Sequence, residues 1–340
     1  MPLPFRPNCL PTALGPLPHP PTVELWDVVL PRLRQLAPVP LLHQHGEDLL
    51  RLALHNLPGA TMAGDHATWG GPDMQTALDT LYVAYLKHQT ESRALDLAAL
   101  EELEQGDGKL RSVQALSTVQ WGPVSLALTL INAEYESALS DPTMVDAIVK
   151  HLYLQLQFQA ERLGHWHKPV LQWLYEPYLE LLDSPFVSLT WEAVHDALSE
   201  VWGQHSGIRG VWVGAHVQLQ QLLASETVEV VGVTLPSPEQ AESWAGDLHS
   251  FIRRKGAIGW GIVPVTSDGL RQVTAGRLAA RFGSVLKALQ EADLPVEYVV
   301  RASMIMPEDT LHQLSPAEAE RVLTLTADLA ELLRQAYAIE

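Results

Sequence analysis

Six side chains that can bind a metal ion or transfer a proton come shortly after segments that we expect to be strands: His19, His43, His45, Glu176, His216 and Asp309. Imidazole and carboxylate ligands together suit zinc, iron or manganese. Their spacing carries no metal signature, because the residues come from different loops of a chain with 14 histidines. We therefore favour hydrogen-bonded pocket or loop side chains and predict no metal site. His43 and His45 form the best pair, since alternate residues of an extended segment point the same way.

Glu176 lies just before Pro177 at the end of an expected strand, beside aromatic residues. A carboxyl group in such a place can have a raised pKa and act as an acid or a base. The alternative is a buried carboxylate bonded to backbone amides or to an arginine of the next strand. The sequence leaves both alternatives open, and Glu176 is the one candidate catalytic residue.

Three tryptophans, Trp121, Trp212 and Trp260, also lie at or near the ends of expected strands. Their rings can form a wall for a flat ligand, such as a pterin, a corrin or a nucleobase. They can instead fill the mouth of a barrel. Tyr178 is a further candidate ligand contact at the same edge.

The chain has one cysteine, Cys9, in a proline-rich N-terminal stretch. A single thiol excludes an internal disulfide framework and any site that needs two thiolates from one chain. We expect Cys9 to be a buried or merely exposed thiol and not a nucleophile. The sequence also lacks the Gly-x-Ser-x-Gly nucleophile elbow of the α/β-hydrolases.

Composition indicates a soluble protein with a large core. Of 340 residues, 47% are hydrophobic and 18% charged, and the formal net charge is −18. So acidic a surface repels nucleic acid and anionic membranes, and we expect neither as a partner. The N-terminus has no signal-peptide pattern, and no stretch approaches the roughly 18 apolar residues of a membrane span. We therefore expect a cytoplasmic protein.

The elements that must position these side chains alternate between strand and helix. Eight such units favour a closed (β/α)8 TIM barrel, of the α/β class, over an open doubly wound sheet. We expect one domain over residues 1–340, with an extended proline-rich arm at 1–10 and a helical insertion at about 58–108. Ligands of such barrels bind at the carboxyl ends of the strands. The expected strands are residues 11–15, 39–43, 111–118, 169–174, 210–214, 228–234, 257–264 and 296–305.

Five pieces of the sequence, in order along the chain, carry a resemblance to a known superfamily. The chain resembles the superfamily of cobalamin-independent methionine synthase and uroporphyrinogen decarboxylase, and most of all short single-barrel relatives of the synthase's catalytic domain. The resemblance implies a TIM barrel with its site at the strand ends. The pieces are Leu14-Gly15-Pro16-Leu17-Pro18-His19, Trp121-Gly122-Pro123-Val124, Glu176-Pro177, Gly259-Trp260-Gly261-Ile262-Val263-Pro264 and residues 314–333.

The resemblance also implies a catalytic zinc ion, which keeps the thiol of homocysteine deprotonated in the synthase. The matching positions here hold Trp212 and Gly214 instead of a His-x-Cys pair, Val233 or Thr234 instead of a Glu, and Asp309 instead of a Cys. No cysteine is available at any of them. We therefore predict that the family's zinc site is absent and that Trp212 fills its space.

Two further positions differ from the family's pattern. The usual Gly-Ser after the first strand is Gly15-Pro16, which has no hydroxyl, and the usual Asp-Glu-Pro is Tyr175-Glu176-Pro177. A tyrosine cannot supply the negative charge of the Asp at neutral pH. Homocysteine binding in the family's manner is therefore not expected.

We predict a methionine-synthase-like barrel, a diverged member of the methyltransferase superfamily that has no thiolate–zinc chemistry and no predicted cofactor. The alternative is a non-catalytic ligand-binding or regulatory barrel, and a tetrapyrrole decarboxylase is a third hypothesis. Whether the protein is an enzyme stays open. Its ligand would be a small molecule of the folate, corrinoid, porphyrin or amino acid class, with Glu176 handling protons and with contacts from Gly15, His19, His43, His45, Trp121, Tyr178, Trp212, His216, Trp260 and Asp309.

Overall fold

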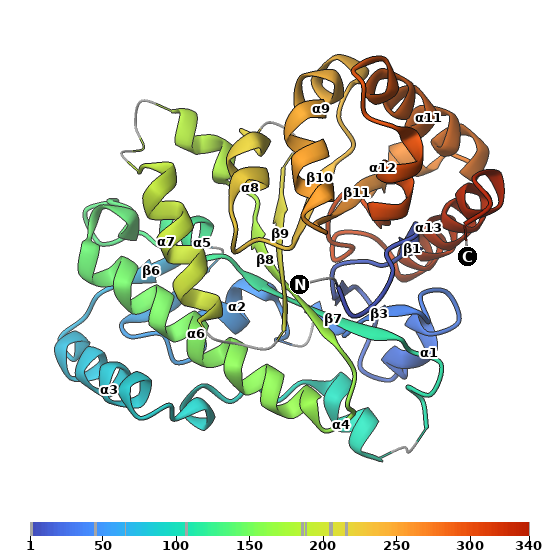
Figure 1. The fold of residues 1–340 in the computed structure, drawn as a ribbon. Coiled ribbons are helices and arrows are strands. Elements are labelled where there is room, and N and C mark those ends of the chain that lie inside the picture. Colours follow the sequence, from blue (N-terminus) through green and yellow to red (C-terminus); the bar gives the residue numbers. More distant parts are fainter. Residues whose placement is uncertain are drawn as a thin grey trace.

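The chain folds into a barrel of parallel strands with helices around it (Figure 1). A computed structural model describes residues 3–43, 46–64, 66–105, 108–184, 187, 189–203, 207–214 and 217–339. Within these ranges one sheet has eight strands, and every neighbouring pair is parallel. The predicted α/β barrel is confirmed. The strand order is β1 (Leu10–Pro11), β12 (Ser303–Pro307), β11 (Ala257–Val263), β10 (Val230–Thr234), β9 (Ile208–Val213), β8 (Val170–Glu176), β7 (Ala115–Trp121) and β3 (Leu36–Pro38).

A second, shorter pair of strands brings the two edges of this sheet together. β2 (Pro16–Leu17) follows β1 and pairs in parallel with β4 (Leu41–Leu42), which follows β3. The Leu41 amide donates to the Gly15 carbonyl at 2.9 Å. A Cβ at Gly15 would lie 2.5 Å from the Val39 carbonyl oxygen. A glycine is therefore required here, and the barrel is nearly closed.

Helices cover the outside of the barrel, and their N-termini carry strong capping signals. The Asp141 side chain caps α6, and Ser237 and Ser315 form capping boxes at α9 and α13, each with a proline in the first turn. Each of these three helices buries an apolar face. The helices are α1 (Leu25–Val29), α2 (Leu49–Leu54), α3 (Met74–Leu86), α4 (Ala98–Gln105), α5 (Pro123–Thr129), α6 (Pro142–Gly164), α7 (Trp191–Trp202), α8 (Leu219–Ala224), α9 (Pro238–Arg253), α10 (Ser267–Leu270), α11 (Ala275–Glu291), α12 (Val296–Ala302) and α13 (Pro316–Ala336).

Two indole rings fill the interior of the barrel. Trp173 of β8 and Trp212 of β9 point inward and are buried. Glycines on other strands make room for them: a Cβ at Gly210 would lie 2.7 Å from the Trp173 ring, and a Cβ at Gly261 would lie 2.6 Å from the Trp212 ring. A Cβ at Gly232 would also overlap the Trp212 ring. Large side chains against glycines thus give the packed interior that TIM barrels require.

Prolines break the first two strands, which the sequence predicts as continuous at residues 11–15 and 39–43. The structure has two short pieces at each place, β1 with β2 and β3 with β4. Pro11, Pro16 and Pro40 have no N–H to donate to a neighbouring strand, so an unbroken ladder cannot form there.

The prediction of the eighth strand at residues 296–305 is wrong in its first part. Val296–Ala302 form α12, and β12 begins only at Ser303. The valines favour a strand. Pro295 at the N-cap starts a helix instead, and this helix buries Val299 and Val300.

The insertion at 58–108 is helical only in part. Its glycine-rich first part contains an antiparallel hairpin, β5 (Ala60–Ala63) with β6 (His66–Trp69). Its second part holds two helices, α3 and α4, which a 3-10 turn at Thr90–Arg93 separates.

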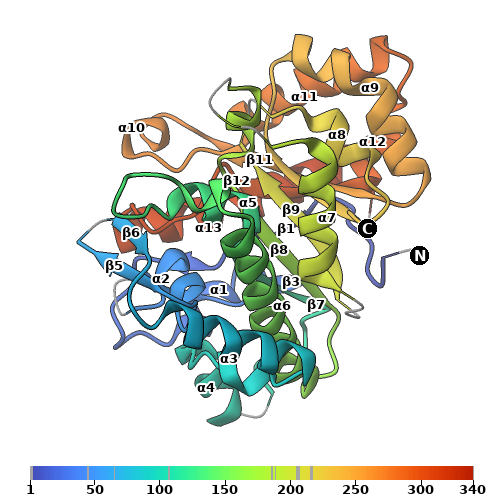
Figure 2. The same ribbon diagram turned by 90° about the vertical axis from the view of Figure 1, so that its left-hand side faces the viewer.

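The two ends of the barrel carry different structures (Figure 2). At the carboxyl ends of the strands lie α2, the hairpin β5–β6 and α10, whereas the N-terminal arm and the C-terminus lie at the opposite end. No helix in the described part of the chain is long and apolar enough to cross a membrane.

Candidate functional site

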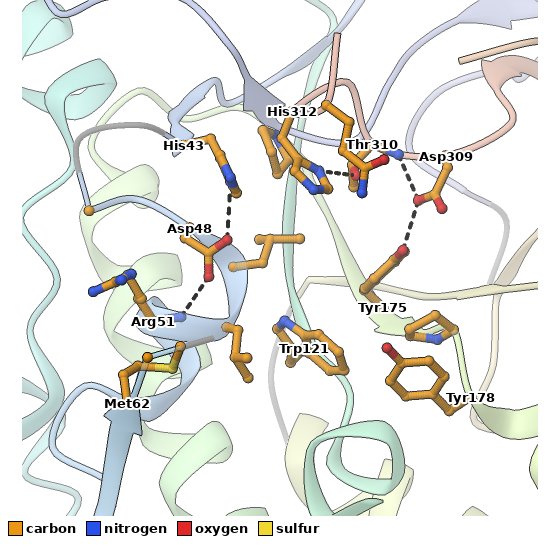
Figure 3. Close-up of a pocket in the computed structure, with 17 residues that line it drawn as sticks. His43, Asp48, Arg51, Met62, Trp121, Tyr175, Tyr178, Asp309, Thr310 and His312 are labelled. Atoms are coloured by element: carbon orange, nitrogen blue, oxygen red, sulfur yellow. Dashed lines mark hydrogen bonds and ion pairs between the residues drawn. The ribbon is translucent and has the colours of Figure 1, made fainter. Parts of the chain in front are cut away.

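A pocket of about 1010 Å³ opens at the carboxyl ends of the strands, on the side of β4, β7, β8 and α2. This is the face at which TIM barrels bind ligands. Figure 3 shows polar and aromatic side chains from distant parts of the sequence meeting around it. Those that matter below are His43, Asp48, Arg51, Trp121, Tyr175, Tyr178, Asp309, Thr310 and His312.

One wall of the pocket combines aromatic rings with a fixed carboxylate. The Tyr175 hydroxyl donates to Asp309 Oδ1 at 2.8 Å, and the Thr310 amide donates to the same oxygen at 2.7 Å. The Trp121 ring stands edge-on to the Tyr175 ring, with the centroids 5.8 Å apart, and lies tilted against the Tyr178 ring, with the centroids 5.9 Å apart. Burial, reinforced by Asp309, raises the pKa of Tyr175 far above its usual range. Tyr175 therefore stays protonated and holds the carboxylate in place.

The opposite wall combines two imidazoles with a second carboxylate. His43 Nδ1 lies 3.1 Å from Asp48 Oδ2, while Asp48 Oδ1 caps α2 by accepting from the Arg51 amide at 3.0 Å. The His43 and His312 rings lie 4.3 Å apart, and His312 Nδ1 is 2.8 Å from Thr310 Oγ1. Burial and the nearby His43 lower the pKa of His312, which favours a neutral ring.

The pocket can therefore offer acceptors, donors and an aromatic surface to a ligand. Asp48 and Asp309 are anchored by hydrogen bonds and can accept from an amino group. Arg51 is the one lysine or arginine among the described residues that line the pocket. His43, oriented by Asp48, has the arrangement of a base that is held by a carboxylate.

Comparisons with known proteins bear on the fold. A scan against protein-family models and a search of curated proteins find no match. Among solved structures, a B12-independent methionine synthase from Shewanella sp. W3-18-1, in complex with selenomethionine, is similar with a TM-score of 0.54 and 13% identity over 96% of this chain and 98% of that chain. A methyltransferase from Methanosarcina mazei is similar with a TM-score of 0.51 and 13% identity over 91% of this chain and 84% of that one.

The chain has the fold of these barrels. At such low identity, the likeness shows the fold alone. It agrees with the resemblance that the sequence motifs indicate, and the alignment spans nearly the whole of both chains.

The positions at which the resemblance implies zinc ligands have other contacts in the structure. Trp212 is buried inside the barrel, Val233 is buried in β10, and Asp309 is bonded to Tyr175 and Thr310. Nowhere in the described ranges do three or more His, Cys, Asp or Glu side chains form a group that could hold a metal ion.

Four of the predicted contact residues, His43, Trp121, Tyr178 and Asp309, come together around the pocket. His45 and His216 lie outside the described residues. Gly15, His19, Trp212 and Trp260 do not line the pocket, although Pro16, next to Gly15, does.

All four of these predicted residues belong to the protein's packing, and Trp212 fills the barrel interior. Gly15 serves the closure of the barrel, as described above. The His19 ring is buried beside α13, with Nε2 3.6 Å from Glu320 Oε1. Trp260 points outward from β11, where it packs on Phe282 of α11 and donates to Ser303 Oγ at 2.9 Å.

Glu176 faces the helix layer, away from the pocket. Its carboxylate is fully buried and accepts from the Val124 amide at 3.0 Å and the Ser125 amide at 2.7 Å, at the first turn of α5. A Cβ at Gly122 would overlap the carboxylate. Burial raises the pKa of Glu176 to about 7, and the hydrogen bonds from Ser125 and Val124 oppose that rise. The structure therefore combines the amide bonds of one alternative that the sequence left open with the raised pKa of the other, and the catalytic role of Glu176 stays a prediction.

Sequence reasoning missed Asp48, Arg51, Tyr175, Thr310 and His312 as pocket residues. Asp48 had a usable signal, because an aspartate just before an apolar run is typical of an N-cap that ends a strand–helix loop. Tyr175 alternates with Trp173 on β8, which places both on the inner face of the strand. Thr310 and His312 had no local signal, since only the closing of the barrel brings their loop to α2.

Proposed function

We propose that this protein binds a small organic molecule at the mouth of its barrel, as a diverged methyltransferase-type barrel that does not use thiolate–zinc chemistry. The observation that carries the proposal is the pocket with two anchored carboxylates, Asp48 and Asp309, on opposite walls and the Trp121 ring between them. A ligand with an amino group and an apolar or flat part would satisfy these walls.

The charges of the pocket favour amino acids over porphyrins. An amino group can donate to Asp309 or Asp48, and a carboxylate can reach Arg51. A porphyrin brings several carboxylates, which two aspartates would repel and a single arginine could not balance. The selenomethionine in the Shewanella structure is a ligand of the favoured kind. With about 1010 Å³, the pocket also has room for a larger molecule such as a folate.

Thermal-shift and calorimetric titrations with methionine, homocysteine, a folate, a corrinoid and a porphyrin test the proposal. Binding at a hundredfold excess over Kd should add about 2.7 kcal/mol of stability. Asp309→Asn should weaken the best ligand about tenfold or more, because a charge-assisted hydrogen bond is worth about 1.5–3 kcal/mol. Trp121→Ala should weaken it about threefold to tenfold, because an aromatic contact is worth about 0.5–1.5 kcal/mol. Trp191→Ala and Asp268→Asn, which lie outside the pocket, are the matched controls. No saturable binding by any of the five ligands, or equal losses in the controls, would overturn the proposal.

The His43–Asp48 pair favours one further possibility at the same pocket, proton transfer to or from the bound molecule. A carboxylate that fixes one ring nitrogen of a histidine leaves the other to act as a base. His43→Gln should then abolish turnover of an identified ligand while changing its Kd less than threefold or so, in the range of an ordinary hydrogen bond. A ligand that binds and is recovered unchanged would support the non-catalytic alternative.

A further inference from the structure

A second pocket, of about 340 Å³, lies at the amino-terminal ends of the strands. Its walls come from the N-terminal arm, the end of α9 and one face of α12, which Figure 2 places on the side of the molecule away from the mouth. Arg6, Lys255 and Arg301 line it together with Tyr298. No part of the candidate ligand site at the mouth contributes to it.

The arm forms a fixed wall of this pocket because it is anchored on both sides of Arg6. The Phe5 side chain is buried in the core, and burying a phenyl ring contributes about 2–3 kcal/mol. The Asn8 amide donates to the Arg301 carbonyl at 3.1 Å, and the Cys9 amide donates to the Ser303 carbonyl at 2.7 Å. Arg6 is therefore held over the start of β12, and the pocket is preformed.

The charge of this pocket is opposite to that of the chain. The protein has a formal net charge of −18, yet the described residues that line the pocket include three cations and no aspartate or glutamate. Lys255 also follows Arg253 and Arg254 directly at the end of α9. One carboxylate approaches the group: Glu297, itself exposed, pairs with Arg301 at 3.0 Å. Cations gathered in a concave site raise the local concentration of anions.

Tyr298 adds a flat apolar surface beside the cations. The residue is 52% exposed, and its ring is inclined by 26° to the His249 ring, with the two centroids 6.5 Å apart. An exposed aromatic ring next to a cationic pocket is a suitable partner for a planar group of a ligand.

We propose that this pocket binds a small phosphorylated molecule with a planar ring, such as a nucleoside monophosphate. The phosphate lies among Arg6, Lys255 and Arg301, where guanidinium groups can donate pairs of parallel hydrogen bonds. The ring rests against Tyr298. The site is independent of the one at the mouth, and both can be occupied together.

Isothermal titration of the full-length protein with AMP, adenosine and inorganic phosphate tests the proposal. AMP should bind with saturation, phosphate more weakly and adenosine least. Raising the salt concentration from 0.05 to 0.5 M (about a threefold shorter Debye length) should weaken AMP binding severalfold. Arg301→Gln and Lys255→Gln should each weaken it about three- to tenfold, the range of a partly exposed charge contact. Arg321→Gln, an equal charge change on the exposed face of α13, should leave it unchanged.

Two further variants locate the ligand. Tyr298→Ala should weaken AMP and leave inorganic phosphate unaffected, whereas Trp121→Ala at the mouth should change neither. Apart from Trp121→Ala, which removes a buried ring, the variants concern exposed side chains. Unchanged far-ultraviolet circular dichroism confirms that each one folds. Absence of saturable AMP binding at millimolar concentration, or equal losses in Arg301→Gln and Arg321→Gln, would overturn the proposal.

Discussion

Glu176 should make the stability of this protein depend on pH in a definite direction. The carboxyl group is buried against the first turn of α5, and its pKa is raised from 4.5 to about 7. Between these two values the folded protein keeps a proton that the unfolded chain releases. The stability contributed by protonated Glu176 is therefore fully present below pH 4.5 and is lost as the pH rises to about 7.

The size of this loss follows from the two pKa values. One pH unit between the folded and unfolded pKa corresponds to about 1.4 kcal/mol, so a rise from 4.5 to about 7 corresponds to about 3 kcal/mol. No discount for solvent screening is needed, since the side chain has no exposed surface. Glu176→Gln is neutral at every pH and keeps the shape of the side chain. Its stability relative to the wild type should therefore improve by about 3 kcal/mol between pH 4.5 and pH 8. Replacing the carboxyl group by a carboxamide has a cost of its own, but that cost does not change with pH.

Urea denaturation at half-unit steps of pH measures this difference, with fluorescence and circular dichroism as two probes of the same transition. Glu242→Gln, at an exposed position on α9, controls for the general effect of removing one negative charge. A difference between Glu176→Gln and the wild type that stays flat with pH would refute the reasoning. A difference of opposite sign would show that the amide hydrogen bonds from Val124 and Ser125 outweigh the burial of the charge.

Three further predictions concern the barrel interior and the thiol. Gly232→Ala places a Cβ against the Trp212 ring and should lower the free energy of unfolding, measured by urea denaturation, by about 1–3 kcal/mol. Gly246→Ala, where a Cβ has nothing within 4 Å, is the control and should not destabilise α9. Equal effects of the two changes would mean that Trp212 does not occupy the barrel interior. Trp212→Ala should cost about 3–5 kcal/mol in the same assay, and a cost below about 1 kcal/mol would contradict a filled interior. Cys9 is buried, and burial raises the pKa of its thiol to about 12; it should react with a thiol reagent at pH 8 only after unfolding, and rapid labelling of the native protein would disprove this.

Much of the fold could be predicted from the sequence because the strongest signals are local. Asp141-Pro142 predicts the start of α6 at the residue where the helix begins. The apolar run ending at Pro264 predicts β11 to within one residue. The errors lie where two local signals compete. The valines of α12 favour a strand, and the outcome depends on Pro295 and on the surface that the segment covers.

The candidate site was predicted less well, because position along a strand does not fix the direction of a side chain. Trp121 and Asp309 point into the pocket, whereas Trp260 and Glu176 point into the helix layer. A shift of one residue in a strand reverses the face that a side chain occupies, and the last residues of a strand are the hardest to assign. Ligand binding by the residues that do line the pocket stays a prediction.

The sequence by itself determined that this chain cannot hold a metal through two thiolates, since it has one cysteine, and that strand and helix alternate along it. Both follow from residue identity and local periodicity. Only the tertiary structure decided that Trp173 and Trp212 fill the barrel and that His43 and Asp48 face Tyr175 and Asp309 across one pocket. These groups are separated by up to about 270 positions in the chain, and nothing short of closing the barrel brings them within reach of a single ligand.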